Sequence, residues 1–81
     1  MNGRKRANLL LDLAAMRAMT ASGEARAVRV AARLSQAEVA AAALVSAAAI
    51  SRWEAGRRVP QGVAAVRYAR VLRVLADRET Q

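Results

Sequence analysis

Residues 34–60 constrain the fold more than any other part of the chain, because they contain the start and stop signals of two short helices. Ser35 precedes Glu38 by three residues, which is the pattern of a capping box. Ser46 can cap a second helix, and Gly56 stands where that helix would end. The sequence therefore predicts two short helices separated by a tight turn.

The remainder of the chain also has the features of helix. Much of the 56% hydrophobic content is alanine, which has the highest helix propensity of any residue. Helical spacing of apolar residues predicts three further helices, over about 7–19, 24–33 and 61–77. The prediction is an all-α fold, a compact five-helix bundle.

The spacing also indicates which side chains these helices bury. The first helix is expected to bury an apolar face made by Leu9, Leu13 and Met16 and widened by Leu10 and Leu11. The last helix is expected to bury Ala65, Tyr68, Leu72 and Leu75. Another side of the last helix is interpreted as a solvated face, formed by Arg67, Arg70 and Arg73.

The charge of the chain points to a polyanionic partner. Its 81 residues include 14 Lys and Arg against 6 Asp and Glu, a formal net charge of +8. Every cation except Lys5 is an arginine, whose planar head group suits bidentate contacts to phosphate and guanine.

The composition argues against catalysis. The chain has no Cys and no His, which excludes disulfides, thiol nucleophiles and most transition-metal sites. It also has no glycine-rich phosphate loop and too few acids to hold a metal. We therefore expect no enzymatic activity, no metal and no cofactor.

The N-terminus resembles a secretion signal only faintly. Three basic residues precede three leucines, but Asp12 and Arg17 interrupt the apolar stretch. The longest run of low charge, over residues 37–51, contains Glu38 and is mostly alanine, so it is not expected to span a bilayer. The sequence predicts a cytoplasmic protein without a membrane partner.

The predicted helix over residues 46–55 has two different sides. At 100° per residue, the large apolar residues Ile50 and Trp53 fall on one side and should pack on the domain. The opposite side is flat, has no acid, and consists of Ala47, Ala48, Ser51 and Arg52. A helix that enters the DNA major groove needs such a side, because small residues allow close approach to the base edges.

These features resemble the helix-turn-helix of Cro and lambda-type repressors, the Xre family. The resemblance covers about residues 24–75 and is carried by Leu34-Ser35-Gln36-Ala37-Glu38, Val45-Ser46, Ile50-Ser51-Arg52-Trp53-Glu54-Ala55-Gly56 and Pro60. It implies a lambda-repressor-like bundle with a DNA-binding domain over 23–78. An additional N-terminal helix and break over 7–22, a basic arm over 1–6 and a tail over 79–81 would complete the chain.

The resemblance implies a set of residues that face the bases. It places Gln36 where relatives contact a phosphate or a base edge, at a helix N-terminus that favours an anion. The outward positions of the recognition helix are occupied by Ala47, Ala48, Ser51 and Arg52. Arg52 could bind guanine in a bidentate manner or clamp a phosphate, and both roles stay open.

Other residues are expected at the phosphates or inside the domain. The expected phosphate contacts are Ser46, which is mainly a helix cap, together with Arg57, Arg58, Arg4, Lys5 and Arg6. Arg29 and Glu54 match a pair that forms a partly buried, structural salt bridge in relatives.

Two positions depart from the family pattern. Leu44 stands in the turn where relatives usually have Gly, and a left-handed backbone there would cost about 1 kcal/mol. Residues 47–49 are all alanine, where relatives often carry polar side chains. Direct readout of bases should therefore be modest, with specificity depending on Arg52, phosphate register and DNA shape.

The resemblance implies a sequence-specific transcriptional regulator of double-stranded DNA, a small phage or bacterial repressor of the Cro type. It would bind a palindromic operator as a homodimer through residues 46–55. The helix over 7–19 could be an added packing helix, a dimer element or a support for the basic arm. Two alternatives remain open, an antitoxin that represses its own operon and binds a toxin, and a phage recombination directionality factor that works with an integrase.

Overall fold

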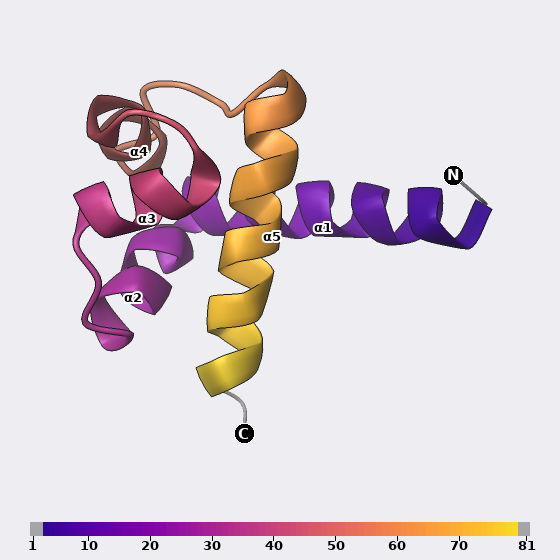
Figure 1. Cartoon of the computed structure of the whole chain (residues 1–81), viewed down its shortest axis with the longest axis horizontal. Helices are drawn as coiled ribbons and strands as arrows, with labels where there is room; N and C mark the ends of the chain where they lie inside the picture. The colour runs from indigo at the N-terminus through magenta and orange to yellow at the C-terminus, as the bar shows by residue number, and fades with distance from the viewer. Residues whose placement is uncertain (1–2, 80–81) are drawn as a thin grey trace.

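The computed structural model describes residues 3–79. In this range the chain forms helices joined by short loops (Figure 1). The predicted all-α, five-helix globule is confirmed. The helices are α1 (Gly3–Ser22), α2 (Glu24–Ala31), α3 (Gln36–Ala43), α4 (Ala47–Glu54) and α5 (Gly62–Glu79). Helices α2, α3 and α4 gather on one side of α5, whereas α1 crosses α5 and extends beyond it on the other side.

The core forms where the apolar side of α5 meets the other helices. The predicted buried face of α5 is confirmed, since Ala65, Tyr68, Leu72 and Leu75 are all buried. The ring of Tyr68 lies 4.8 Å from the ring of Trp53, in a tilted arrangement. Such an aromatic pair contributes about 0.5–1.5 kcal/mol beyond its buried area, so it ties α4 firmly to α5.

The caps of α3 and α4 are those that the sequence predicts. The Ser35 hydroxyl accepts the backbone N–H of Glu38 at 3.0 Å, and the Glu38 carboxylate accepts that of Ser35 at 2.9 Å. The Ser46 hydroxyl accepts the backbone N–H of Ala49 at 3.1 Å. These local bonds fix where both helices begin.

Helices α2, α3 and α4 all end in the same way, through a left-handed residue at Arg33, Leu44 or Gly56 (φ 60°, 58° and 71°). In each case the next residue donates its N–H back across the last turn, as Val45 does to the Ala40 carbonyl at 3.0 Å. This is the Schellman motif, for which glycine is the usual residue. The predicted strain at Leu44 is therefore present in the structure, and its side chain is 72% exposed.

The N-terminal helix is longer than the sequence predicts. It begins at Gly3, so residues 3–6 form its first turn instead of the expected arm, and residues 1–2 lie outside the described part. Arg and Lys are good helix formers, and extending a helix adds one hydrogen bond for each residue fixed. The expected break also shrinks to Gly23 (φ 86°), because the hydroxyls of Thr20 and Ser22 bond to carbonyls three residues back.

The expectation that Leu10 and Leu11 widen the buried face of α1 is wrong. Met16 is fully buried and Leu13 packs against the core, but Leu10 and Leu11 are 66% and 68% exposed. The reason is that α1 meets α5 as a crossing helix, so only a narrow side of its N-terminal half touches the body.

The solvated arginine face expected on α5 is wrong for Arg67, which is half-buried, whereas Arg70 and Arg73 are exposed. Arg67 donates from Nε to the Ala43 carbonyl at 2.7 Å and from Nη2 to the Leu44 carbonyl at 3.3 Å. Arg73 forms an ion pair with Asp12 of α1 at 3.1 Å. These long side chains reach acceptors on helices that the linear sequence does not place beside them.

Candidate nucleic-acid interface

Helix α4 presents the two sides that its sequence predicts. Ile50 is fully buried and Trp53 nearly so. The outward residues Ala47, Ala48, Ser51 and Arg52 are all exposed. The last residue of the helix, Glu54, turns its carboxylate inward, where its side chain is 3% exposed. The exposed side of α4 is thus small, without acid, and provided with hydroxyl and guanidinium donors.

Helix α5 stabilises the turn between α3 and α4. Small buried residues of α3, Ala40 and Ala43, permit close packing of the helices. The guanidinium of Arg67 then satisfies carbonyls at the C-terminal end of α3, where a cation is favourable. Sequence reasoning missed this residue, and its only local signal is a long cation on the side of α5 next to the buried positions.

An ion pair between Arg29 and Glu54 joins α2 to the end of α4. Arg29 donates from Nε to Glu54 Oε2 at 2.6 Å and from Nη2 to Oε1 at 2.9 Å, the bidentate arrangement of a strong pair. Its remaining nitrogen, Nη1, donates to the Leu34 carbonyl at 2.9 Å. Both side chains are largely buried, so the pair fixes the orientation of α4 against the domain.

The surroundings of Glu54 keep it ionised. Burial raises the pKa of this carboxyl, but hydrogen bonds from Arg29 and Gln36 and the charge of Arg29 outweigh that effect, so the pKa lies below its ordinary value. The hydrogen bond to Glu54 in turn raises the pKa of Arg29. The two charges are therefore both present at neutral pH.

Gln36 lies at the first turn of α3 and takes part in the same network. Its Nε2 donates to Glu54 Oε1 at 3.1 Å, and the residue is half-buried. An amide nitrogen carries two hydrogens. The bond to Glu54 fixes the orientation of the amide next to α4, and a second N–H is left on the same atom.

The expected phosphate contacts fall into two separate regions. Ser46, Arg57 and Arg58 are exposed and flank the two ends of α4. In contrast, Arg4, Lys5 and Arg6 lie near the N-terminus of α1, on the other side of α5 from α4 (Figure 1). The structure therefore does not bring these N-terminal cations to the recognition helix.

The sequence predicts that Tyr68 is buried, but it did not reveal the environment of the Tyr68 hydroxyl. Tyr68 is fully buried, and its hydroxyl has no hydrogen-bond partner within residues 3–79. Burial, with a smaller contribution from the charge of Glu54, raises the pKa of Tyr68 to about 12. The residue therefore stays neutral and serves the core by packing against Trp53.

A capped helix pair on a basic domain, in which the exposed side of the second helix has no acid, defines a DNA-binding helix-turn-helix protein. A family profile described as helix-turn-helix matches residues 26–77 of the chain. The chain belongs to this family, the Cro and lambda-repressor type also called Xre, and carries its DNA-binding domain. No curated protein and no solved structure matched the chain. Within residues 3–79, the helices lack the combination of length and apolar composition that crossing a bilayer requires.

Proposed function

We propose that this protein is a sequence-specific transcriptional regulator that represses by placing α4 in the DNA major groove. The observation that carries this proposal is the exposed side of α4, which combines three small residues with one arginine while the large residues face the core. A major groove admits a helix of this kind and offers donors, acceptors and thymine methyl groups at the base edges.

The residues on the outer side of α4 would make different kinds of contact with the DNA site. Ala47 and Ala48 can contact only thymine methyl groups, and Ser51 can exchange one hydrogen bond with a base edge. Arg52 can bind guanine in a bidentate manner, or clamp a phosphate. Most of the discrimination between bases would therefore come from Arg52, with the rest from DNA shape.

The phosphates would be held at both ends of α4. Arg57 and Arg58 follow the helix, Ser46 precedes it, and all three are exposed. Gln36 would donate its second amide hydrogen to a phosphate while Glu54 holds the first. In this arrangement the buried ion pair sets the position of a DNA contact without touching DNA itself.

Two copies would bind a palindromic site, with half-sites about 34 Å apart. The surface proposed for pairing is the outer side of α1, which is exposed along its whole length and consists of Ala7, Leu10, Leu11, Ala14, Ala18 and Ala21. A helix that is apolar on both sides is normally covered on both sides. Charge favours an antiparallel pair, because Arg4 and Arg6 of one copy would then lie near Glu24 of the second.

The decisive experiment is selection of bound fragments from the source genome, followed by affinity measurements on single-base variants of the recovered site. We expect a site with two-fold symmetry and affinity that falls steeply with salt, in proportion to the phosphates contacted. Arg52→Ala should abolish most discrimination between bases. Sharp discrimination that persists in Arg52→Ala, or affinity that does not change between low and physiological salt, would contradict the proposal.

A further inference from the structure

An apolar pocket with a volume of about 180 Å³ lies between α1 and α5. Its apolar walls come from both helices and consist of Ala15, Met16, Met19, Ala69, Leu72 and Ala76. The polar members of its lining are Asp12, Arg73 and Asp77. An apolar cavity of about 150 Å³ can hold a group the size of benzene, so this pocket has room for one aliphatic side chain.

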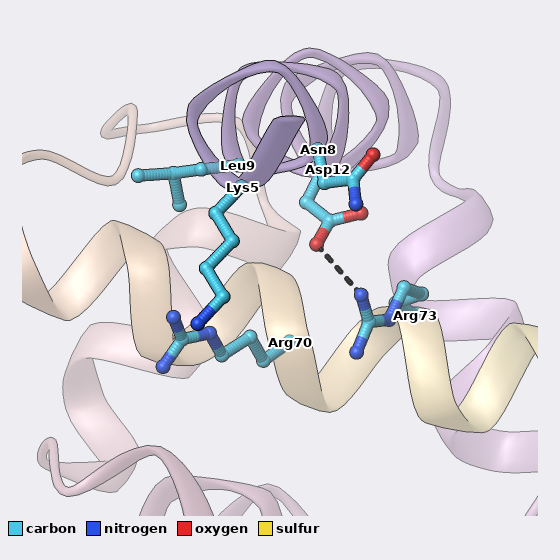
Figure 2. Close-up of a pocket in the computed structure, with 6 residues that line it drawn as sticks. All are labelled: Lys5, Asn8, Leu9, Asp12, Arg70 and Arg73. Carbon is cyan, nitrogen blue, oxygen red and sulfur yellow. Dashed lines mark hydrogen bonds and ion pairs between the residues drawn. The ribbon is translucent and has the colours of Figure 1, made fainter. Parts of the chain in front are cut away.

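The ion pair between Asp12 of α1 and Arg73 of α5 borders the pocket, with Asp12 Oδ2 accepting from Arg73 Nη1 at 3.1 Å (Figure 2). The same two residues also line a neighbouring, more polar pocket, which is the one drawn in Figure 2. Because the two charges satisfy each other, the alanines, methionines and Leu72 decide what the apolar pocket accepts. An aliphatic side chain suits such a lining better than water, which needs several polar partners.

Leu11 is an exposed apolar residue on the same side of α1 as this pocket. It precedes Ala15 by four residues, so the two side chains are neighbours on one face of the helix. Leu10 instead precedes Ala14, which is not part of the pocket lining. The two leucines are almost equally exposed, at 68% and 66%. When two α1 helices lie side by side, Leu11 is therefore the one of the two that can reach the pocket of a second copy.

The antiparallel pairing of α1 brings Leu11 of one copy level with the pocket of the other. When the basic first turn of one α1 lies beside Glu24 of the second copy, Leu11 comes level with Ala18 of that copy. Ala15 and Met19, which line the pocket, are the neighbours of Ala18 on the helix. The relation is reciprocal, because a two-fold pair gives each copy one leucine to insert and one pocket to receive.

We propose that Leu11 of one copy enters this pocket of a second copy, and the reverse, so that two identical contacts hold the dimer. The proposal rests on the two-fold pairing put forward in the proposed function, and it names the residue and the receiving pocket that specify the pair. Methionine side chains adapt their shape to a neighbour, and the alanines leave room for the incoming leucine. An aliphatic anchor in a pocket is the kind of contact around which a specific interface forms.

The first test measures association by sedimentation equilibrium, without DNA, for the unchanged protein, Leu11→Ala and Leu10→Ala. Both substitutions remove the same atoms from equally exposed positions of one helix, so Leu10→Ala is the matched control. We expect Leu11→Ala to weaken dimerisation about a hundred-fold or more, because each dimer loses two buried leucine side chains. Leu10→Ala should weaken it by less than about ten-fold.

Circular dichroism verifies that both variants keep their helix content, as expected for exposed positions. A dimer that responds to Leu10→Ala as strongly as to Leu11→Ala overturns the proposal. An unchanged protein that stays monomeric at all concentrations also overturns it.

The second test locates the inserted side chain by NMR. A mixed dimer combines one copy labelled at its leucine methyl groups with one copy labelled at its methionine methyl groups. Any nuclear Overhauser effect between the two labels then arises between copies. We expect one from Leu11 to Met19, with the leucine signal assigned by its loss in Leu11→Ala. A dimer that lacks this contact has Leu11 elsewhere and contradicts the proposal.

Neither measurement involves DNA, so the two proposals can fail separately. A dimer that depends on Leu11 in a protein that binds no DNA would refute the proposed function and leave this contact standing. A monomer whose DNA binding depends on Arg52 would refute the contact and leave recognition by α4 standing.

Discussion

At the scale of single residues, Glu54 has the largest consequences. Its buried carboxylate accepts three hydrogen bonds, two from Arg29 of α2 and one from Gln36 of α3. One side chain at the end of α4 thus connects three helices. Losing one partner of such a pair is costly because the other charge is left buried and unpaired.

Glu54→Gln should lower the free energy of unfolding at neutral pH by about 3 kcal/mol. The pKa of Glu54 is lowered in the folded state, so its contribution is complete above the ordinary glutamate pKa and is lost as the pH falls through the lowered value. Urea unfolding at a series of pH values from neutral to acid should therefore show the gap between variant and unchanged protein closing in acid.

Glu38→Gln is the control for this experiment, because glutamine can also close a capping box and Glu38 is exposed. It should change stability much less than Glu54→Gln at neutral pH. A stability gap for Glu54→Gln that is constant across the whole pH series would show that the charge of Glu54 is not what the network uses.

Leu44→Gly should raise the free energy of unfolding by up to about 1 kcal/mol. The substitution removes a left-handed backbone penalty and loses little packing, since the leucine side chain is 72% exposed. In a domain of this size, 1 kcal/mol corresponds to about 4–8 °C in Tm. Thermal unfolding measures the change, with Leu44→Ala as the control that keeps the penalty. A glycine variant no more stable than the alanine variant would contradict this explanation.

At the scale of elements, local signals and tertiary contacts explain different parts of the structure. The caps of α3 and α4 and the buried side of α5 depend on residues within one or two turns of each other. They could therefore be predicted from the sequence. The outward side of α4 could be predicted in the same way. Ile50 and Trp53 lie on one side of the helix and must pack on the core, so the opposite side is exposed.

What could not be predicted depends on the crossing of α1 and α5. Helical periodicity placed Leu10 and Leu11 on the same buried face as Leu9. In the structure Leu10 and Leu11 are exposed, because of the way in which α1 crosses α5. The same crossing brings Arg73 to Asp12, which lies 61 residues earlier in the chain. The position of the N-terminal cations was missed for a different reason, because a basic arm was expected over residues 3–6, where α1 already begins.

Arg67→Gln should weaken the end of α3 and the turn, because two hydrogen bonds from a charged group are lost. We expect a loss of about 1.5 kcal/mol in the free energy of unfolding and faster amide hydrogen exchange around residues 43–47. Arg70→Gln, one turn further along α5, is the matched control and should leave both unchanged. Equal effects of the two substitutions would show that Arg67 acts only through net charge.

At the scale of the whole molecule, α1 makes the chain asymmetric. Its C-terminal half completes the core with Met16 and Met19, while its N-terminal half carries two exposed leucines, Leu10 and Leu11. An 81-residue chain has a small core, so further burial by a partner would add substantially to stability. The exposed length of α1 is the surface where a second copy would add most.

Leu10→Gln with Leu11→Gln should convert the proposed dimer to a monomer. The substitutions remove the largest apolar side chains of the proposed contact without reaching the core, so the fold should persist. Sedimentation equilibrium gives the association state, and circular dichroism verifies the helix content. Val63→Gln with Val74→Gln changes equally exposed apolar residues of α5 and should leave the dimer intact. An unchanged protein that is monomeric at all concentrations would rule out this use of α1.

The alanine side of α4 has a consequence for how the protein can change. Its side chains contribute nothing to the packing of the domain, since the orientation of the helix is already secured by Ile50, Trp53 and the carboxylate at its end. Positions 47, 48 and 51 can therefore accept many different side chains while the fold stays intact. New operator preferences could therefore arise by substitution at these positions alone. Each added side chain would change the DNA site that the protein selects.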